Sequence, residues 1–215
     1  MDVIKPQLIK AMPDIERFVS YCERESYRAK SLIIQVGSVS ESLYLILEGS
    51  VTVLLEGGED HDLVASYLNP GDFFGEMGLF SDAEEEPRSA AIRAKSQCEV
   101  AHISYQKFHQ IRNQFPDIMY TIAHQMADRL RHTNRKLSDL AFVDVSGRVA
   151  HTLMELCEEP DAITHPDGMQ IKVTRQEIGR LVGCSREMAG RVLKNLEDEG
   201  LLEAHGKTIV VYGTR

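Results

Sequence analysis

TRQEIGRLVGCSREMAGRVLK, residues 174–194, has the pattern of two short helices joined by a tight turn. Thr174 followed by Glu177 fits the capping box that begins a helix, and Gly183 stands where a helix end requires a left-handed residue. Ser185 is suited to cap the second helix. Each helix has one apolar side, made of Ile178, Leu181 and Val182 in the first and of Met188, Ala189, Val192, Leu193 and Leu196 in the second. The stretch therefore predicts a helix-turn-helix.

The opposite side of the second helix has side chains suited to reading DNA. Its members recur at intervals of three and four: Arg186, Glu187, Gly190, Arg191 and Lys194. Arginine fits the O6 and N7 atoms of guanine, glutamate can accept from cytosine N4, and lysine suits phosphate. The alternative is a structural hairpin with a solvated charged face. Residues 170–194 contain six basic and two acidic residues, in a chain whose net charge is −9, and a generic hairpin needs no such local reversal.

Bulk properties limit the class of protein. A chain of 215 residues allows one or two domains, and its acidic balance argues against a non-specific coat for nucleic acid. No run is long enough to span a membrane and the first twenty residues lack a signal-peptide pattern, so we expect a cytoplasmic protein without a membrane partner. Four cysteines lie far apart without metal-ligand spacing, which predicts reduced thiols and no metal: Cys22, Cys98, Cys157 and Cys184.

The sequence pattern of residues 1–115 is typical of a β-domain. Short apolar runs alternate with glycine-marked turns, at residues 31–36, 42–57, 62–68, 90–94 and 98–104. Runs of this length with frequent turns predict an antiparallel roll of the jelly-roll kind. Together with the helices that follow, this roll places the chain in the α+β class.

A long helix is expected over residues 116–137. Pro116 fits its first turn, and an apolar stripe repeats at every fourth position, at Ile118, Ile122, Met126 and Leu130. Such a helix either caps the roll or pairs with its twin in a second subunit. We favour a homodimer, because helix-turn-helix proteins commonly bind two half-sites one helical turn apart.

The remaining residues complete a second domain. Residues 138–146 are expected to form a hinge, and residues 147–215 a winged helix-turn-helix domain. The wing is the hairpin predicted for LLEAHGKTIVVYGT, residues 201–214, which turns at His205 and Gly206.

Residues 71–94 contain the elements of an anion site. Gly75 allows close approach of the backbone, and Arg88 with Ser89 supplies a planar cation and a hydroxyl, both suited to phosphate. Glu76 can accept from sugar hydroxyls. The alternative is that the glycines serve only strand turns and that Arg88 pairs with one of Glu84, Glu85 and Glu86. Spacing alone leaves both interpretations open.

The chain resembles the cyclic AMP receptor family within the CRP/FNR superfamily, in the branch of gamma-proteobacterial global and virulence regulators. The segments with the resemblance are FGEMGLF (74–80), PRSA (87–90), LAFVDVSGRVA (140–150), THPDGMQIKVTRQEIGRLVGCSRE (164–187) and HGKTIVVYGTR (205–215).

The resemblance implies a cyclic AMP pocket, with cyclic AMP as the allosteric effector. By this resemblance Gly75 and Glu76 meet the ribose, and Arg88 and Ser89 hold the cyclic phosphate. Two residues of the long helix contribute as well. Thr133 matches a threonine that bonds the adenine amino group, and Asn134 stands where the family has a serine that reaches from the partner subunit.

The resemblance also assigns the contacts with DNA and RNA polymerase. It implies base contacts from Arg186, Glu187 and Arg191 in a palindromic TGTGA-like site, and backbone contacts from Arg175, Gln176, Ser185, Lys194 and His205. A loop that touches the C-terminal domain of the polymerase α subunit matches Thr164, His165, Pro166, Asp167 and Gly168. A second polymerase contact of the family is basic. Glu23 and Glu25 occupy the corresponding positions here beside Lys107, so we do not expect that contact to work in the same way.

The sequence thus predicts a cyclic AMP-dependent transcription activator and not an enzyme. HExxH, P-loop and GxSxG motifs are missing from the sequence. The alternative keeps the DNA-binding role but changes the effector to cyclic di-GMP or to none. Oxygen sensing through an iron–sulfur cluster is disfavoured, because Cys22 is the only cysteine of the N-terminal region.

Overall fold

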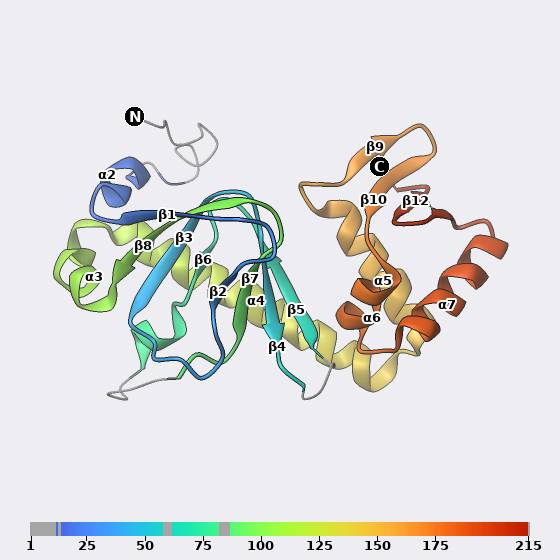
Figure 1. The fold of residues 1–215 in the computed structure, drawn as a ribbon, viewed down its shortest axis with the longest axis horizontal. Helices are drawn as coiled ribbons and strands as arrows, with labels where there is room; N and C mark the ends of the chain where they lie inside the picture. The colour runs from blue at the N-terminus through green and yellow to red at the C-terminus, as the bar shows by residue number, and fades with distance from the viewer. Residues whose placement is uncertain (1–11, 13, 58–61, 82–86, 215) are drawn as a thin grey trace. The chain divides into compact units, whose positions relative to one another are not determined.

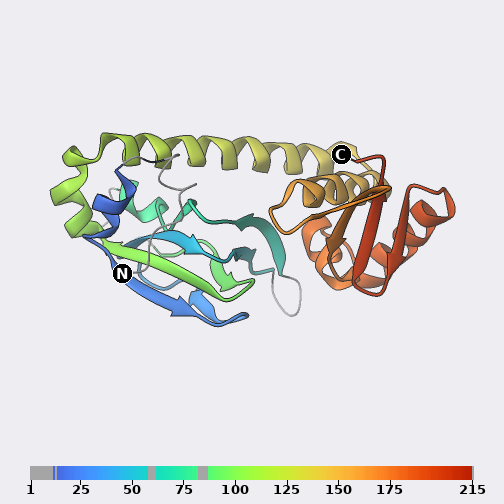
Figure 2. The ribbon, with the colours of Figure 1, turned by 90° about the horizontal axis from the view of Figure 1, so that it is seen from above.

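The computed structural model describes residue 12 and residues 14–57, 62–81 and 87–214. For these residues the chain forms two compact units. One runs through residue 56 and over 65–132, and the other takes 57–64 and 133–215. Figures 1 and 2 show the course of the chain through the elements of each unit.

The strands that precede the long helix form two four-stranded sheets, with strand orders β1-β8-β3-β6 and β2-β7-β4-β5 (Figure 1). Their bounds are β1 Glu23–Tyr27, β2 Leu32–Ile34, β3 Ser42–Glu48, β4 Val51–Leu55, β5 Leu63–Leu68, β6 Phe73–Phe74, β7 Ala91–Ala94 and β8 Cys98–Ser104. Every pair with a described register is antiparallel. This is the roll that the sequence predicts, and the α+β class is confirmed.

Short helices close one side of the roll. They are α2 (Ile15–Val19), α3 (Tyr105–Ile111) and the 3-10 segments η1 (Met77–Phe80) and η2 (Arg112–Gln114). Phe18 of α2 is buried and makes edge-on ring contacts with Phe73, Phe108 and Phe115, at centroid distances of 6.0, 6.1 and 5.6 Å. Aromatic pairs of this geometry stabilise a core beyond the area that they bury. A second core lies between the sheets, around Ile46 and Val100.

The long helix α4 spans Pro116–Phe142 and is therefore longer than the expected 116–137 (Figure 2). Neither glycine nor proline interrupts it after Pro116, so nothing in the backbone ends the helix earlier. Asp144 then caps the next helix by accepting from the Gly147 N–H at 2.8 Å. Of the expected hinge 138–146, only Val143 and Asp144 lie outside helices. The hinge role itself stays a prediction.

The apolar stripe of α4 has two environments. Ile118 and Ile122 are buried in the core with Phe18, and Met126 packs against that core from a partly exposed position. Leu130 is instead 62 % exposed. The first turns of α4 therefore close the roll, whereas the later turns present apolar side chains on the surface of this chain.

The second unit places three helices beside a small sheet (Figure 1). The helices are α5 Val145–Glu158, α6 Arg175–Val182 and α7 Arg186–Asp198, and the strands are β9 Ile163–His165, β10 Gly168–Lys172, β11 Leu202–His205 and β12 Thr208–Tyr212. The sheet has the order β11-β12-β10-β9, and its described pairs are antiparallel. Helices α6 and α7 with the hairpin β11–β12 form the expected winged helix-turn-helix.

The capping signals of residues 174–194 are confirmed. The Thr174 hydroxyl accepts from the Glu177 N–H, and the Ser185 hydroxyl accepts from the Met188 N–H, each at 3.1 Å. Gly183 ends α6 with a φ of 72°. One expectation was wrong. Met188 is only partly buried, because the core side of α7 begins one residue later, at Ala189.

Gly179 is a structural requirement that the sequence analysis missed. A Cβ atom at this position would lie 2.6 Å from the Cys184 carbonyl oxygen. The Gly179 carbonyl oxygen also accepts from the N–H groups of Gly183 and Cys184, both at 2.9 Å. The turn between the two helices thus folds back directly onto the backbone of α6, and only glycine leaves room for it.

Among the described residues, every helix is either too short or too polar to span a lipid bilayer.

Gly179→Ala should destabilise the second unit by about 1–3 kcal/mol, because the new methyl group overpacks a rigid backbone contact. The same change in an unconstrained helix stabilises by about 1 kcal/mol. Urea unfolding followed by circular dichroism measures the difference. Gly190→Ala is the matched control on α7, since its Cβ would meet the flexible side chain of Arg175 at 3.3 Å. Equal stability of the two variants would contradict this account.

Candidate ligand pocket and DNA-recognition surface

Arg88 is the centre of the candidate anion site. Its side chain is buried, and the residue is 8 % exposed. The guanidinium donates to the Ser42 carbonyl oxygen at 2.8 Å, to the Gly75 carbonyl oxygen at 3.0 Å and to the Tyr105 hydroxyl at 3.1 Å. All three acceptors are neutral, so these bonds hold the guanidinium without neutralising its charge. Such a group can bind phosphate through charge-assisted hydrogen bonds.

In the alternative given in the sequence analysis, Arg88 forms an ion pair with an acidic residue of the preceding loop. Glu84, Glu85 and Glu86 lie outside the described residues. The described side-chain hydrogen bonds of Arg88 join it to three segments of the roll: β3, the turn at Gly75 and the start of α3.

Gly75 provides the close approach that an anion pocket needs. It has a φ of +75°, and a Cβ atom there would lie 2.7 Å from Arg88 Nη1 and 2.9 Å from the Ser42 carbonyl oxygen. A larger residue would both strain the backbone and fill the space beside the guanidinium. Gly75 is therefore required for two reasons. It allows the turn between β6 and η1, and it leaves space beside the Arg88 guanidinium.

Tyr105, which lies later in the sequence, also holds the Arg88 guanidinium in place. Its hydroxyl donates to the Gly75 carbonyl oxygen and accepts from Arg88. Burial raises the pKa of Tyr105, so the hydroxyl keeps its proton and can act as donor and acceptor at once. The sequence analysis missed this residue, because no local pattern joins position 105 to position 75.

Glu76 is a buried carboxylate, 8 % exposed, next to Gly75. Its Oε1 atom accepts from Arg129 Nη1 of α4 at 3.0 Å, and Arg129 also donates to the Phe73 carbonyl oxygen. A carboxylate has two oxygens with several acceptor positions, so Glu76 can accept from a sugar hydroxyl in addition to Arg129.

Helix α4 is bonded to this loop at a second point. The Gln125 side chain accepts from the Phe73 N–H and donates to the Gly71 carbonyl oxygen, each at 2.8 Å. Gln125 and Arg129 are four residues apart and share one face of the helix. The sequence contained a signal for this face, because Thr133 follows at the same interval, but the analysis followed only the apolar stripe.

The remaining candidate residues of the pocket are exposed. Ser89 directly follows Arg88, and its hydroxyl donates to the Met77 sulfur at 3.4 Å. Thr133 and Asn134 are exposed on α4 and belong to the second unit. Their contact with a ligand stays a prediction.

The predicted DNA-contacting side chains are all exposed in the second unit: Arg175, Gln176, Ser185, Arg186, Glu187, Arg191, Lys194 and His205. Arg186, Glu187, Arg191 and Lys194 lie on α7 or at its start, opposite its buried residues. We call α7 the recognition helix. Gly190 lies on its accessible side and leaves room for the Arg175 side chain at the start of α6.

The wing places His205 at the turn of the hairpin β11–β12. His205 Nε2 lies 2.8 Å from Glu203 Oε1, and Tyr212 donates to the other oxygen of Glu203 at 3.4 Å. The hydrogen bond from His205 holds the pKa of Glu203 below its usual range. The His205 side chain is well exposed, so its position suits a contact with a phosphate.

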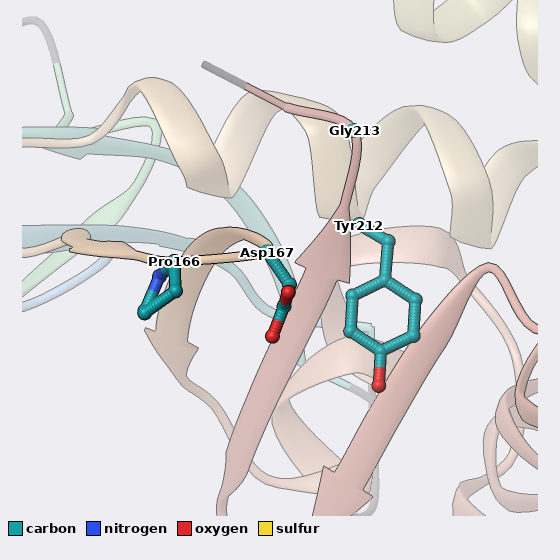
Figure 3. Close-up of a pocket in the computed structure, with 4 residues that line it drawn as sticks. All are labelled: Pro166, Asp167, Tyr212 and Gly213. Atoms are coloured by element: carbon teal, nitrogen blue, oxygen red, sulfur yellow. The ribbon is translucent and has the colours of Figure 1, made fainter.

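The predicted polymerase loop is the tip of the hairpin β9–β10. Thr164 and His165 end β9, Pro166 and Asp167 form the turn, and Gly168 begins β10. Figure 3 shows Pro166 and Asp167 beside Tyr212 and Gly213, which together line a hollow of about 630 Å³. Thr164, Pro166 and Asp167 are exposed, whereas His165 is partly exposed and Gly168 is buried.

The residues of the second polymerase patch are exposed as well. Glu23 and Glu25 lie on β1, and Lys107 lies on α3. The expected loss of this contact stays a prediction. In the described part of the chain, no three His, Cys, Asp or Glu residues converge in a way that would hold a metal ion.

Two family models match the chain. Residues 24–115 match the cyclic nucleotide-binding domain, and residues 147–212 match the Crp-like helix-turn-helix domain. The two matches define a class of regulators in which a nucleotide-binding roll is joined to a DNA-binding domain. The anion pocket lies within the first match and the recognition helix within the second.

Similar proteins are known across most of the chain. It is 58 % identical over 202 residues to the cAMP-activated global transcriptional regulator Vfr of Pseudomonas aeruginosa, which covers 94 % of each protein. It is 56 % identical over 203 residues to the cAMP-activated global transcriptional regulator CRP of Salmonella typhimurium, covering 94 % of this chain and 96 % of that one. The chain belongs to the CRP/FNR family, and the resemblance drawn from its sequence is confirmed.

A solved structure shares both the fold and much of the sequence. The c-di-GMP responsive global regulator CLP of Xanthomonas campestris is 45 % identical with a TM-score of 0.87, covering 94 % of this chain and 99 % of that one.

Proposed function

We propose that this chain is a cyclic AMP-dependent transcription regulator that works as a homodimer on palindromic DNA. The observation that supports it most is the buried Arg88 guanidinium, held by neutral oxygens beside Gly75 and Glu76. A cyclic phosphate supplies the negative charge that this guanidinium lacks. The two closely similar regulators named above are cAMP-activated.

Each residue of the pocket has a separate task in this proposal. Arg88 and Ser89 hold the cyclic phosphate, and Gly75 leaves room for it. Glu76, oriented by Arg129, accepts from the ribose 2′-hydroxyl. Thr133 bonds the adenine amino group, and Asn134 reaches the ligand from the partner subunit. Asparagine both donates and accepts, so it can replace the serine that the family has there.

The dimer forms through α4. Its exposed apolar side chains include Tyr120, Leu130, Leu137, Leu140 and Phe142, and the three leucines share one face of the helix. Large apolar side chains on one face of a long helix are best covered by a second helix of the same kind. The pairing also supplies Asn134 to the partner's pocket.

The second unit contacts DNA in the way of other helix-turn-helix proteins, a docking rule established in part on members of this family. The recognition helix enters the major groove, where Arg186, Glu187 and Arg191 contact base edges of a TGTGA-like half-site. Arg175, Gln176, Ser185, Lys194 and His205 contact the backbone and fix the register.

The ligand acts by a shift between two states of the dimer. Arg129 bonds α4 to Glu76, and Gln125 bonds it to Phe73 of the preceding strand β6. The same helix continues to the junction at Val143 and Asp144. A change at Glu76 therefore reaches the helix that precedes the DNA-binding domain. Coupling of about 1–3 kcal/mol between the two sites suffices for a switch of this kind.

The regulator activates transcription through the exposed tip of the hairpin β9–β10. Thr164, His165, Pro166, Asp167 and Gly168 contact the C-terminal domain of the polymerase α subunit. The protein works in the cytoplasm, where its DNA is, and has no catalytic role.

Cyclic di-GMP is the second candidate effector. The regulator CLP, 45 % identical to this chain, is described as c-di-GMP responsive. Asn134 in place of serine is a difference in this chain that bears on the choice between the two ligands.

Titration of DNA binding with cyclic AMP, cyclic GMP and cyclic di-GMP separates these candidates. With a TGTGA palindrome as the probe, cyclic AMP should raise the affinity at least about fivefold, the lower end of ordinary allosteric coupling. Fluorescence anisotropy of labelled DNA measures it. Unchanged affinity at saturating cyclic AMP would exclude the first candidate, and a response to cyclic di-GMP alone would establish the second.

Arg88→Leu should abolish the cyclic AMP response with the fold intact. Loss of charge-assisted bonds to phosphate should raise the Kd for cyclic AMP by about 10- to 100-fold. Calorimetry measures the Kd, and circular dichroism checks the fold. Arg93→Leu is the matched control, because Arg93 is an exposed arginine on β7 that bonds only the Lys30 carbonyl oxygen among its described hydrogen-bond partners. Equal losses in both variants would refute the role of Arg88.

Glu187→Ala should relax base preference by about 1–3 kcal/mol at one position of each half-site while leaving cyclic AMP binding unchanged. Lys194→Ala should instead weaken binding to all sequences alike and make binding less dependent on salt. Binding to a set of single-base variants at two salt concentrations measures both effects. If both variants lose the same affinity for every DNA sequence, the separate roles of Glu187 in base reading and Lys194 in phosphate contact are contradicted.

A further inference from the structure

Met77 lies beside the proposed phosphate pocket, directly after Glu76, as the first residue of η1. Its sulfur accepts a hydrogen bond from the Ser89 hydroxyl at 3.4 Å. Ser89 is one of the two residues that hold the cyclic phosphate in the function proposed above. A thioether is a weak acceptor, so phosphate can readily take over this hydroxyl.

The position of Met77 is fixed although its side chain is open to solvent. A Cβ atom on the next residue, Gly78, would lie 2.6 Å from the Cβ of Ser40, so η1 packs closely on the segment before β3. Met77 itself is 58 % exposed. Among the methionines that the structure describes, only Met154 of α5 is comparable, at 51 %, and the others are partly or fully buried.

None of the four thiols is as exposed as the Met77 side chain: Cys98 and Cys157 are buried, and Cys22 and Cys184 are partly buried. Burial raises the pKa of all four cysteines, and that of Cys22 rises to about 12. The thiolate is the reactive form of cysteine, so these thiols react slowly with oxidants near neutral pH. An exposed thioether needs no deprotonation before it reacts.

We propose that Met77 is an oxidation site, at which peroxide converts the thioether to a sulfoxide and thereby lowers the affinity of the pocket for cyclic AMP. The inference rests on the proposed function. In the reaction a sulfur lone pair attacks one peroxide oxygen, the O–O bond breaks and an S–O bond forms. Sulfur is oxidised by two electrons, and the second peroxide oxygen leaves as water. Methionine sulfoxide reductases reverse the change.

The sulfoxide acts on the pocket through Ser89. Its oxygen has a partial negative charge and accepts hydrogen bonds far better than a thioether does. It therefore keeps the Ser89 hydroxyl for itself and places negative charge beside the site of the phosphate. Loss of one neutral hydrogen bond to the ligand corresponds to an increase of about fivefold in Kd, and repulsion adds to it.

The test compares wild type, Met77→Leu and Met154→Leu, each before and after treatment with hydrogen peroxide. Peptide mass spectrometry locates the added oxygen, a thiol assay checks the cysteines, and calorimetry measures the Kd for cyclic AMP. We expect oxidised wild type and oxidised Met154→Leu to bind about fivefold more weakly than their untreated forms. Met77→Leu should keep its own untreated affinity. Methionine sulfoxide reductase should restore the wild type.

The outcomes separate this inference from the proposed function. If untreated wild type binds no cyclic AMP, the proposed function fails and the inference with it. If untreated protein binds and peroxide weakens Met77→Leu as much as wild type, the effect arises elsewhere and only the inference is overturned. The inference would also be overturned if, in the same peroxide-treated sample, Met154 is oxidised and Met77 is not.

Discussion

The burial of one positive charge organises the candidate pocket of the first unit. Removing a guanidinium from water costs several kcal/mol unless its donors find partners, and Arg88 finds them on three segments that are distant in sequence. These partners are neutral, so the charge is held in place but not cancelled. This arrangement requires both Gly75 and Tyr105. Gly75 leaves space beside the guanidinium, and Tyr105 bonds the guanidinium to the turn at Gly75.

The same turn is bonded to α4, which gives the pocket a mechanical connection. Arg129 bonds Glu76 and Phe73, and Gln125 bonds Phe73 of β6 and Gly71 just before that strand. In the proposed switch α4 transmits a displacement, because its 27 residues contain no glycine or proline after Pro116. Only Val143 and Asp144 separate it from α5.

Local signals were read correctly from the sequence, and contacts between distant segments were not. The caps at Thr174 and Ser185 and the left-handed Gly183 depend on neighbours within four residues, and all are as expected. Gly179, Tyr105 and Arg129 are required by residues that lie 5, 30 and 53 positions away. Pattern and propensity contain no information on which side chains the fold brings together. The sequence and the resemblance therefore named candidate residues for a pocket, and the structure shows how Gly75, Tyr105 and Arg88 are bonded to one another.

In the proposed dimer, the charge of the protein makes the length and pairing of α4 important for DNA binding. The chain is acidic overall, at −9, and the basic excess around the recognition helix, six basic against two acidic residues at 170–194, is local, so general attraction to DNA is weak. Contacts from a single recognition helix then give little affinity. Two recognition helices held at a fixed separation bind DNA more tightly than one, because the second contact becomes intramolecular. This gain in affinity disappears when the geometry does not allow both helices to contact the DNA at once. An acidic regulator of this design is therefore sensitive to small changes in spacing, which is the property that a ligand at the other end of α4 can use.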